Sequence, residues 1–283
     1  MSAAVGGGKP KFVDTHIHFD YIMARLEKPL EDITSLIETH FKSVPLVKKK
    51  AVELSGEWEA SVHITCDPVT FANARVLLKY DNVYVGAGVH PHHAKDYSDA
   101  VEEELVEMHK DPKVRAWGEM GLDYHYNQSP PDVQRAVFAR QLQRAVSLGK
   151  PMIIHTREAE DDSFAIMSEH VPREWKIHVH CFTSSLQFAQ RLMEHFPNLV
   201  FGFTGVVTFG NAQDVQSVVQ SVPLERMVLE TDGPFLAPVP FRGLPATSGM
   251  IPKIADKIAE LKGVDVGEVY RAARANTERI YSI

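Results

Sequence analysis

Two histidines near the start of the chain lie two residues apart in the apolar, β-branched segment Phe12–His18. Such a run after Pro10 is typical of a short strand, on which alternate side chains point to one face. His16 and His18 therefore project together as two imidazoles that can bind one cation, with Asp14 behind them on the same face. If the pair stood alone, two ordinary structural histidines would be the preferred interpretation, because a short motif needs supporting context.

Four further residues of metal-binding types follow at the ends of predicted strands, namely Glu119, His155, His180 and Asp232. Four imidazoles with two carboxylates form a set that suits divalent transition metals, and the carboxylates also suit magnesium. Six ligands exceed the needs of one tetrahedral catalytic site, but two ions about 3.5 to 4 Å apart would use them all. We therefore predict two divalent ions (Mg, Mn or Zn) with Glu119 as the bridging ligand.

Eight short β-like segments must position these ligands, and a plausible helical segment follows each of them. The predicted strands are Phe12–His18, Ser61–Cys66, Val83–His90, Arg115–Leu122, Pro151–Thr156, Ile177–Phe182, Leu199–Gly205 and Met227–Thr231. Eightfold strand–helix alternation predicts an α/β protein with a closed (β/α)₈ TIM barrel, whose chemistry lies at the carboxyl ends of its strands. A doubly wound open sheet is the alternative, but no Gly-x-Gly-x-x-Gly turn follows the first strand.

We expect a single barrel domain over residues 11–283, preceded by a flexible tail over residues 1–10. The last predicted helix, Val266 to Tyr281, would pack on the outside of the barrel. The long first crossover contains the basic run Lys48-Lys49-Lys50, which is typical of a solvated helix face.

Composition and charge limit the functional classes. The chain is 44% hydrophobic, carries a formal net charge of −7 and contains two cysteines, so it needs no disulfide framework. No apolar run is long enough for a membrane span, and residues 1–10 lack the apolar core of a secretory signal. We therefore expect a cytoplasmic or nuclear protein, with a monomer as the favoured assembly. The acidic balance argues against a broad basic nucleic-acid surface, but not against a phosphate held by metals and a few arginines.

Five motifs resemble, in order, the signatures of the TatD-related metal-dependent hydrolases, which belong to the amidohydrolase superfamily of TIM barrels. They are His16-x-His18, Gly118-Glu119-x-Gly121-Leu122-Asp123-Tyr124, Ile154-His155-x-Arg157, His180-Cys181-Phe182 and Glu230-Thr231-Asp232-x-Pro234. The resemblance covers Phe12 to about Ile280 and implies a deoxyribonuclease-type phosphodiesterase that uses two divalent metals. It assigns one metal to His16, His18, Glu119 and Asp232, and the other to Glu119, His155 and His180. It also implies that Asp232 accepts the proton of the attacking water.

The sequence departs from the family pattern at two places. Thr183-Ser184 follows His180-Cys181-Phe182 where the family has Ser-Gly, and the segment after the last strand lacks the usual Asn-Glu-Pro. In that segment, Thr247 or Ser248 can still cap the next helix. The metal ligands are all retained, so these departures concern the substrate pocket and the substrate itself.

Arg157 and His90 are the candidate substrate-binding and catalytic residues beside the ligands. Arg157 lies two residues after His155 and leans to the same side, where its planar guanidinium suits two phosphate oxygens. A salt bridge to Glu158 or Asp161 is its alternative role. His90 closes the third strand, and the family resemblance favours a pocket role for it, either donating to phosphate or acting as an acid.

For the residues next to these candidates, the sequence gives weaker evidence of a functional role. Asp123 and Tyr124 are expected to position a ligand or stack on a base, with a structural role as the alternative. Asp14 is expected to hydrogen-bond a ligand histidine from the layer behind, and Glu230 could act similarly. Cys181 alternates away from His180 and is expected to pack in the core.

Three functions fit these observations. The first is a metal-dependent hydrolase that cleaves DNA phosphodiester bonds. The second is an amidohydrolase-superfamily enzyme for a small ester, lactone or amide, because loop variation on a barrel changes the substrate readily. The third is a non-catalytic interaction protein, against which the complete ligand set argues.

Overall fold

A computed structural model of the chain describes residues 8–41 and 55–283. Most of the predicted tail and the basic run at residues 48–50 lie outside the described residues. Within residues 8–41 and 55–283, no helix combines the length and apolar character of a membrane span.

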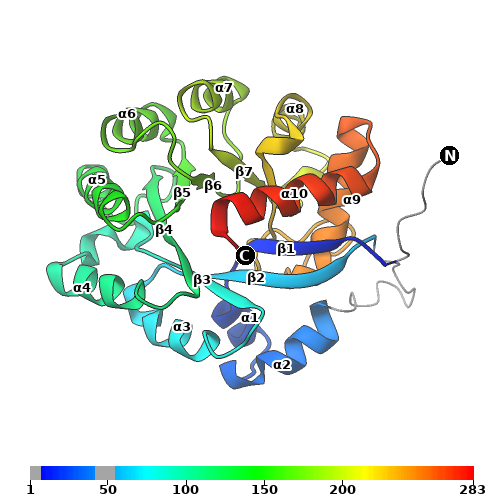
Figure 1. Cartoon of the computed structure of the whole chain (residues 1–283), viewed down its shortest axis with the longest axis horizontal. Helices are drawn as coiled ribbons and strands as arrows, with labels where there is room; N and C mark the ends of the chain where they lie inside the picture. The colour runs from blue at the N-terminus through cyan, green and yellow to red at the C-terminus, as the bar shows by residue number, and fades with distance from the viewer. Residues whose placement is uncertain (1–7, 42–54) are drawn as a thin grey trace.

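Eight parallel strands follow one another around the sheet in the order of the sequence. They are β1 (Lys11–Ile17), β2 (Glu57–Thr65), β3 (Val83–Ala87), β4 (Val114–Asp123), β5 (Met152–Arg157), β6 (Ile177–Val179), β7 (Val200–Phe203) and β8 (Met227–Leu229). A bridge between Ile17 and Gly233 joins the end of β1 to the segment after β8, and the His18 amide donates to the Gly233 carbonyl at 2.8 Å. The predicted TIM barrel is confirmed (Figure 1).

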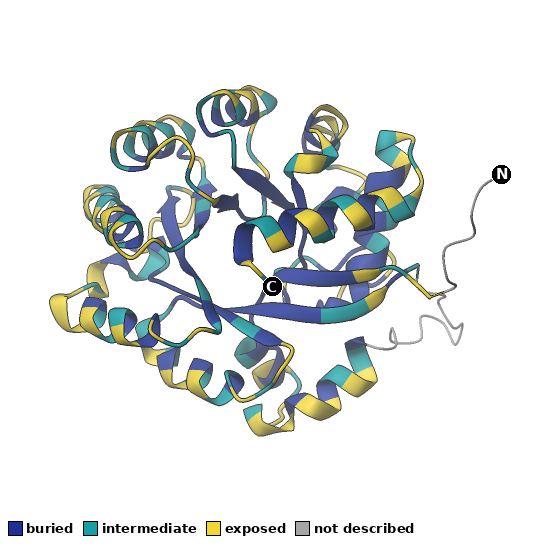
Figure 2. Cartoon of the chain, viewed as in Figure 1, coloured by how far each residue is buried: buried dark blue, intermediate teal, exposed yellow. Residues whose placement is uncertain are grey.

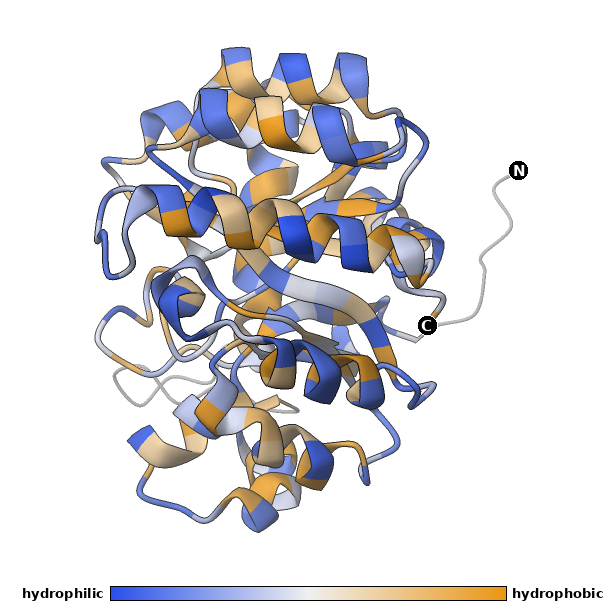
Figure 3. Ribbon diagram, turned by 90° about the vertical axis from the view of Figure 1, so that its left-hand side faces the viewer, coloured by the Kyte–Doolittle hydropathy of each residue, from blue (hydrophilic) through white to orange (hydrophobic). Residues whose placement is uncertain are grey.

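Helices surround this barrel because each connection carries an amphipathic segment. They are α1 (Phe19–Arg25), α2 (Ile33–Leu36), α3 (Phe71–Leu77), α4 (Asp99–Met108), α5 (Pro131–Ser147), α6 (Glu160–His170), α7 (Leu186–His195), α8 (Gln213–Ser221), α9 (Ile251–Lys262) and α10 (Val266–Tyr281). The strands are buried while the outer helix faces are exposed (Figure 2), and the helices show alternating hydrophilic and hydrophobic stripes (Figure 3).

The last helix, α10, has the predicted bounds but does not lie wholly on the outside of the barrel. It crosses one end of the barrel, and the carboxyl terminus lies over the middle (Figure 1). Ile280 and Tyr281 are buried among inward-facing residues of the strands, such as Val62 and Ile153. The last turn enters the barrel because these two large apolar side chains fill its amino end.

A buried carboxylate on α4 ties two helices together. Glu102 is 5% exposed and accepts hydrogen bonds from Arg140 and Arg144 on α5 and from Tyr97. Burial alone would raise the pKa of Glu102, but these hydrogen bonds outweigh it and lower the pKa to about 2.

We expect Glu102→Gln to lower the free energy of unfolding by about 1 to 3 kcal/mol at pH 7, the range for charged hydrogen bonds. Because the folded pKa lies below the unfolded one, this stabilisation is present above about pH 4.5 and is lost as the pH falls toward 2. Urea unfolding of both proteins at pH 7 and pH 3 would measure it. An equal difference at both pH values would contradict the assignment.

Candidate metal centre

A cavity of about 620 Å³ opens at the carboxyl ends of the strands, and five of the six predicted ligands line it: His18, Glu119, His155, His180 and Asp232. The sixth, His16, is completely buried beneath them. The ligands come from β1, β4, β5 and the segments after β1, β6 and β8, which converge because the strand ends of a barrel form one ring. The structure therefore brings together all six residues.

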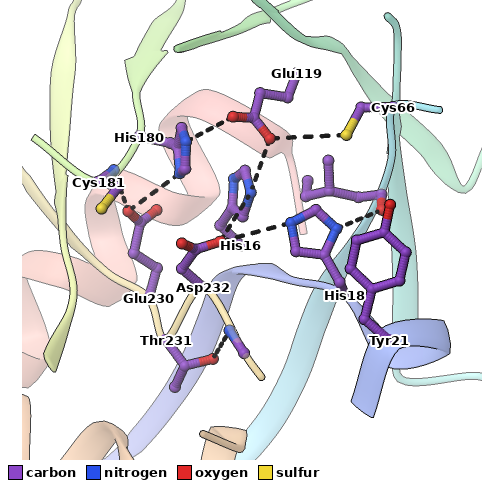
Figure 4. A network of polar contacts seen from close by, with 12 residues as sticks. His16, His18, Tyr21, Cys66, Glu119, His180, Cys181, Glu230, Thr231 and Asp232 are labelled. Carbon is purple, nitrogen blue, oxygen red and sulfur yellow. Dashed lines mark hydrogen bonds and ion pairs between the residues drawn. The ribbon is translucent and has the colours of Figure 1, made fainter. Parts of the chain in front are cut away.

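Glu119 lies at the centre of this cluster and uses both carboxylate oxygens. Its Oε1 is 2.7 Å from His180 Nε2, and its Oε2 is 3.3 Å from His16 Nε2 (Figure 4). The same Oε1 is 2.8 Å from His155 Nδ1. Burial disfavours the charged carboxylate, but the nearby His180 and His90 hold the pKa of Glu119 well below its usual range. A carboxylate that faces different imidazoles with each oxygen is placed as a bridging ligand would be.

Asp232 faces the histidines of the first strand. Its Oδ1 is 3.5 Å from His18 Nε2 and 3.7 Å from His16 Nε2. β8 has already ended at Leu229, and the backbone of Asp232 has a φ of 55°. The local turn, rather than strand alternation, thus directs this carboxylate toward β1, where the Asp232 amide donates to the His16 carbonyl at 2.9 Å.

The second ring nitrogen of three ligand histidines faces a fixed acceptor outside the centre. His18 Nδ1 is 3.1 Å from the Ile64 carbonyl, and His155 Nε2 is 3.3 Å from Asp123 Oδ2. His180 Nδ1 is 3.8 Å from Glu230 Oε1. At His18 and His155 the acceptor is within hydrogen-bond distance and favours a proton on the outer nitrogen, so that the inner nitrogen can face a metal ion. Glu230 is too far from His180 Nδ1 for a hydrogen bond and acts there only through its charge.

His16 provides the test of whether the cluster fits a metal. Neither of its ring nitrogens has a hydrogen-bond partner in the described part of the chain, although both are buried. Burial, followed by the charge of His180, lowers the pKa of His16 to about 4, so the ring is neutral. A buried neutral imidazole whose Nε2 faces two carboxylates without bonding them is what a metal ligand requires, and the donor set fits a divalent ion.

Metal binding to this cluster must compete with protons. Burial disfavours the cationic ring of His155, but hydrogen bonds with Asp123 and Glu119 outweigh it and raise the pKa of His155 to about 9. Because a metal binds only the deprotonated imidazole nitrogen, its binding would displace that proton and weaken as the pH falls.

Arg157 is the one lysine or arginine among the described residues that line the cavity. The alternative ion pairs predicted for it do not form. Glu158 pairs with His125 at 2.7 Å and Asp161 pairs with Arg191 at 2.6 Å. The Arg157 guanidinium instead lies 4.7 Å from the ring centroid of Tyr126, and within the described chain it has no carboxylate partner.

His90 also lines the cavity, with Nε2 3.4 Å from Glu119 Oε1. Burial, more than any neighbouring charge, lowers the pKa of His90 to about 3, so the ring is neutral. Its Nδ1 accepts a hydrogen bond from the His92 amide at 3.1 Å, which places the ring proton on Nε2. Of the two predicted roles, this tautomer favours donation to a ligand over action as an acid.

The structure separates the predicted pair Asp123 and Tyr124. Asp123 lines the cavity, is 1% exposed and contacts His155 and, at 2.9 Å, His92 Nε2. Tyr124 points out of the barrel, where its hydroxyl donates to Asp162 at 2.6 Å, so a role in contacting substrate is not supported. Neighbouring residues on a strand face opposite sides, which is the physical reason for the separation.

Asp14 is held by groups other than the expected ligand imidazole. Its carboxylate accepts hydrogen bonds from the Thr231 hydroxyl at 2.6 Å and the Ser248 hydroxyl at 2.8 Å, and more weakly from the His16 amide at 3.4 Å. Burial raises the pKa of Asp14 to about 7, and these hydrogen bonds only partly oppose the rise. Asp14 thus contacts His16 at its backbone amide and not at its ring.

The expected helix cap and the expected direction of Cys181 were wrong. The Ser248 hydroxyl binds Asp14 and the Thr247 hydroxyl donates to the His40 carbonyl, so neither caps α9, which begins after a short 3₁₀ turn. Cys181 lines the cavity because β6 ends at Val179 and the Cys181 backbone is left-handed, with a φ of 44°. Strand alternation therefore no longer applies at Cys181.

The cavity lining also includes residues that the sequence analysis did not single out, among them His92, Cys66 and Tyr126. Cys66 has its Sγ 3.9 Å from Glu119 Oε2, and the Tyr126 ring lies against the Arg157 guanidinium. The spacing of His92 two residues after His90 was a usable signal. The positions of Cys66 and Tyr126 follow from tertiary packing and leave no local pattern.

Glu230 lies below the ligands in a buried polar network. Its Oε2 is 2.9 Å from His178 Nε2, but the two atoms are not aligned as a hydrogen bond. On the other side of the same ring, His178 Nδ1 is 2.6 Å from the Tyr281 hydroxyl. Oε1 accepts a hydrogen bond from the Cys181 amide at 2.5 Å. The network thus connects the last helix to the segment that carries His180.

We expect Glu230→Gln to weaken metal affinity by about 10- to 100-fold, because residues that orient a ligand contribute on this scale. Metal titration with a competing chelator would measure it. Glu194→Gln, on the exposed face of α7, is the matched control. Unchanged affinity in Glu230→Gln would show that His180 needs no support from this carboxylate.

The barrel and its cluster of histidines and carboxylates define a metal-dependent hydrolase of the TIM-barrel class. The model of a family described as TatD related DNase matches residues 13–282, so the chain belongs to that family and the resemblance seen in the sequence is confirmed.

Three relatives illustrate the match. A human protein named 3'-5' RNA nuclease TATDN2 is 37% identical over 281 residues, which cover 96% of this chain but 35% of the human protein. The Bacillus subtilis protein YabD, an uncharacterised metal-dependent hydrolase, is 37% identical over 80% of this chain and 88% of its own length. The crystal structure of the TatD homologue YJJV from Escherichia coli has a TM-score of 0.82 and 26% identity, covering 96% of this chain and 98% of that one.

Proposed function

We propose that this protein is a two-metal nuclease that cleaves DNA phosphodiester bonds. The observation that carries the proposal is Glu119, whose two oxygens face three candidate ligand imidazoles within 3.3 Å. Arg157 lies beside them without a carboxylate partner among the described residues. The description of the family as a DNase supports DNA, whereas the name of the human relative makes RNA the second polymer to test.

In this proposal, His16, His18 and Asp232 would hold one divalent ion and His155 and His180 would hold the other, and Glu119 would serve both. When bound, two ions supply a net charge of about +2 over the two carboxylates, lower the pKa of a water molecule and stabilise the attacking and leaving oxygens. Magnesium, manganese and zinc are the candidate ions.

The chain's own groups then bind and orient the phosphate. Asp232 faces the open cavity and can accept the proton of the attacking water. The Arg157 guanidinium is held over Tyr126 with its donors free for two phosphate oxygens, and His90 offers its Nε2 proton as a further donor. Asp123 would then act by orienting His155 rather than by contacting substrate.

We expect Arg157→Ala to leave metal content intact and to weaken transition-state binding of a phosphodiester by about 1 to 3 kcal/mol, as for a charged hydrogen bond. Steady-state kinetics on an oligonucleotide, with metal content measured in parallel, would test this. Arg191→Ala, whose guanidinium lies on the outer helices, is the control. Unchanged KM and kcat in Arg157→Ala would remove Arg157 from the site.

The function is tested by reconstituting the protein with each metal and assaying single- and double-stranded DNA, RNA, and a panel of small esters, lactones and amides. We expect DNA cleavage that a chelator abolishes and metal restores. Robust lactone or amide turnover without nucleic-acid cleavage would support the second enzyme function instead. No turnover with either class of substrate would support the interaction protein. Cytoplasmic or nuclear location and a monomeric state remain part of this proposal.

A further inference from the structure

Two aromatic side chains at the cavity mouth are exposed to solvent. Tyr126 is 55% exposed and Phe235 is 42% exposed, and they are the two aromatics among the large hydrophobic residues that the described chain exposes. Both also line the metal cavity. Single exposed apolar side chains are ordinary on a protein surface, so exposure alone is not evidence of a binding role. The informative observation is that both exposed rings line the same cavity as the candidate metal ligands.

Each ring has an arginine against it. The Arg157 guanidinium lies 4.7 Å from the Tyr126 ring centroid, and the Arg25 guanidinium lies 5.6 Å from that of Phe235. Arg25 is further fixed by donating to the Pro234 carbonyl at 3.2 Å. An aromatic face with an adjacent cation is the combination that binds a nucleobase together with its phosphate.

The two pairs lie on opposite sides of the ring of strands. Tyr126 follows β4, next to β5 and Arg157, whereas Phe235 follows β8, next to β1 and the Arg25 of α1. Phe235 also packs edge-on against the ligand His18, with centroids 6.3 Å apart. The metal ligands therefore lie between the two rings.

We propose that Tyr126 and Phe235 are stacking platforms for the bases on either side of the scissile phosphate of a single-stranded nucleic acid. This inference rests on the proposed nuclease function and adds the two side chains that contact the bases. In a duplex each base already stacks on its neighbours, so both of its faces are occupied, whereas a single strand can place unstacked bases against the rings. A net charge of −7 argues against a broad basic surface, so local contacts of this kind would contribute much of the affinity.

Binding of a fluorescent single-stranded oligonucleotide with slowly cleaved phosphorothioate linkages, measured by anisotropy on the metal-loaded protein, tests the proposal. The comparison strand has the same backbone but abasic sites. We expect the strand with bases to bind about tenfold tighter or more, and Tyr126→Leu and Phe235→Leu each to lose about 5- to 100-fold of that affinity, with no loss for the abasic strand. Tyr126→Phe should rescue binding, and Leu244→Ala, at a residue that is also 42% exposed, should not alter it.

Two results would overturn the proposal that Tyr126 and Phe235 stack on bases. One is equal binding of the two strands by the wild type, and the other is unchanged affinity in both leucine variants at normal metal content. A failure of the nuclease proposal is separate. If the nuclease proposal fails, the metal-loaded wild type will cleave no nucleic acid. The stacking proposal would still be supported if the wild type binds the strand with bases more tightly and the leucine variants lose this preference.

Discussion

Glu119→Ala is expected to abolish phosphodiester cleavage, lowering kcat/KM by about 10³-fold or more, and to remove bound metal. The reason is geometric, because the carboxylate lies 2.7 Å from His180, 2.8 Å from His155 and 3.3 Å from His16 and so faces three candidate ligands at once. The substitution also removes the negative charge that these imidazoles share. Those imidazoles that are protonated would then repel one another.

The measurement is metal content by atomic absorption together with cleavage of a labelled oligonucleotide across a range of metal concentrations. Glu104→Ala, which breaks a surface ion pair with Arg75, is the matched control and should retain activity. A Glu119→Ala protein that keeps two ions and wild-type turnover would disprove the bridging assignment. Retention of one ion without turnover would agree with it.

Asp232→Asn is expected to lower kcat by about 10² to 10⁴-fold while the protein remains able to bind metal. An amide oxygen can still act as a ligand at the position that faces His16 and His18, but it cannot accept the proton of the attacking water. The substitution therefore separates the two roles proposed for Asp232.

Single-turnover rates at saturating metal, with metal content in parallel, would check this expectation. Asp214→Asn, at an exposed position on α8, is the control. If Asp232→Asn keeps a wild-type rate, the proton acceptor is another group. If it loses the metal entirely, Asp232 acts first as a ligand, and the proton-transfer role would have no support.

Much of the fold follows from local patterns in the sequence. Short apolar runs alternating with amphipathic segments define a parallel sheet covered by helices, and their number defines a barrel. Because all strands of such a barrel point the same way, residues at their carboxyl ends must share one rim. This is why His16, Glu119 and Asp232 could be grouped without coordinates, although over a hundred residues separate each from the next.

The tertiary structure decided what lies beyond the strand ends, where period-two alternation no longer applies. Left-handed backbone at Cys181 and Asp232 redirects both side chains toward the cavity. The exposed Tyr126 and the free guanidinium of Arg157 also depend on how separate loops meet, because Glu158 and Asp161 find partners elsewhere. Residue type and spacing were therefore enough to group the candidate metal ligands, since such residues need only the correct strand end. Contacts between loops that are distant in sequence determined the substrate side of the site, since no local period encodes them.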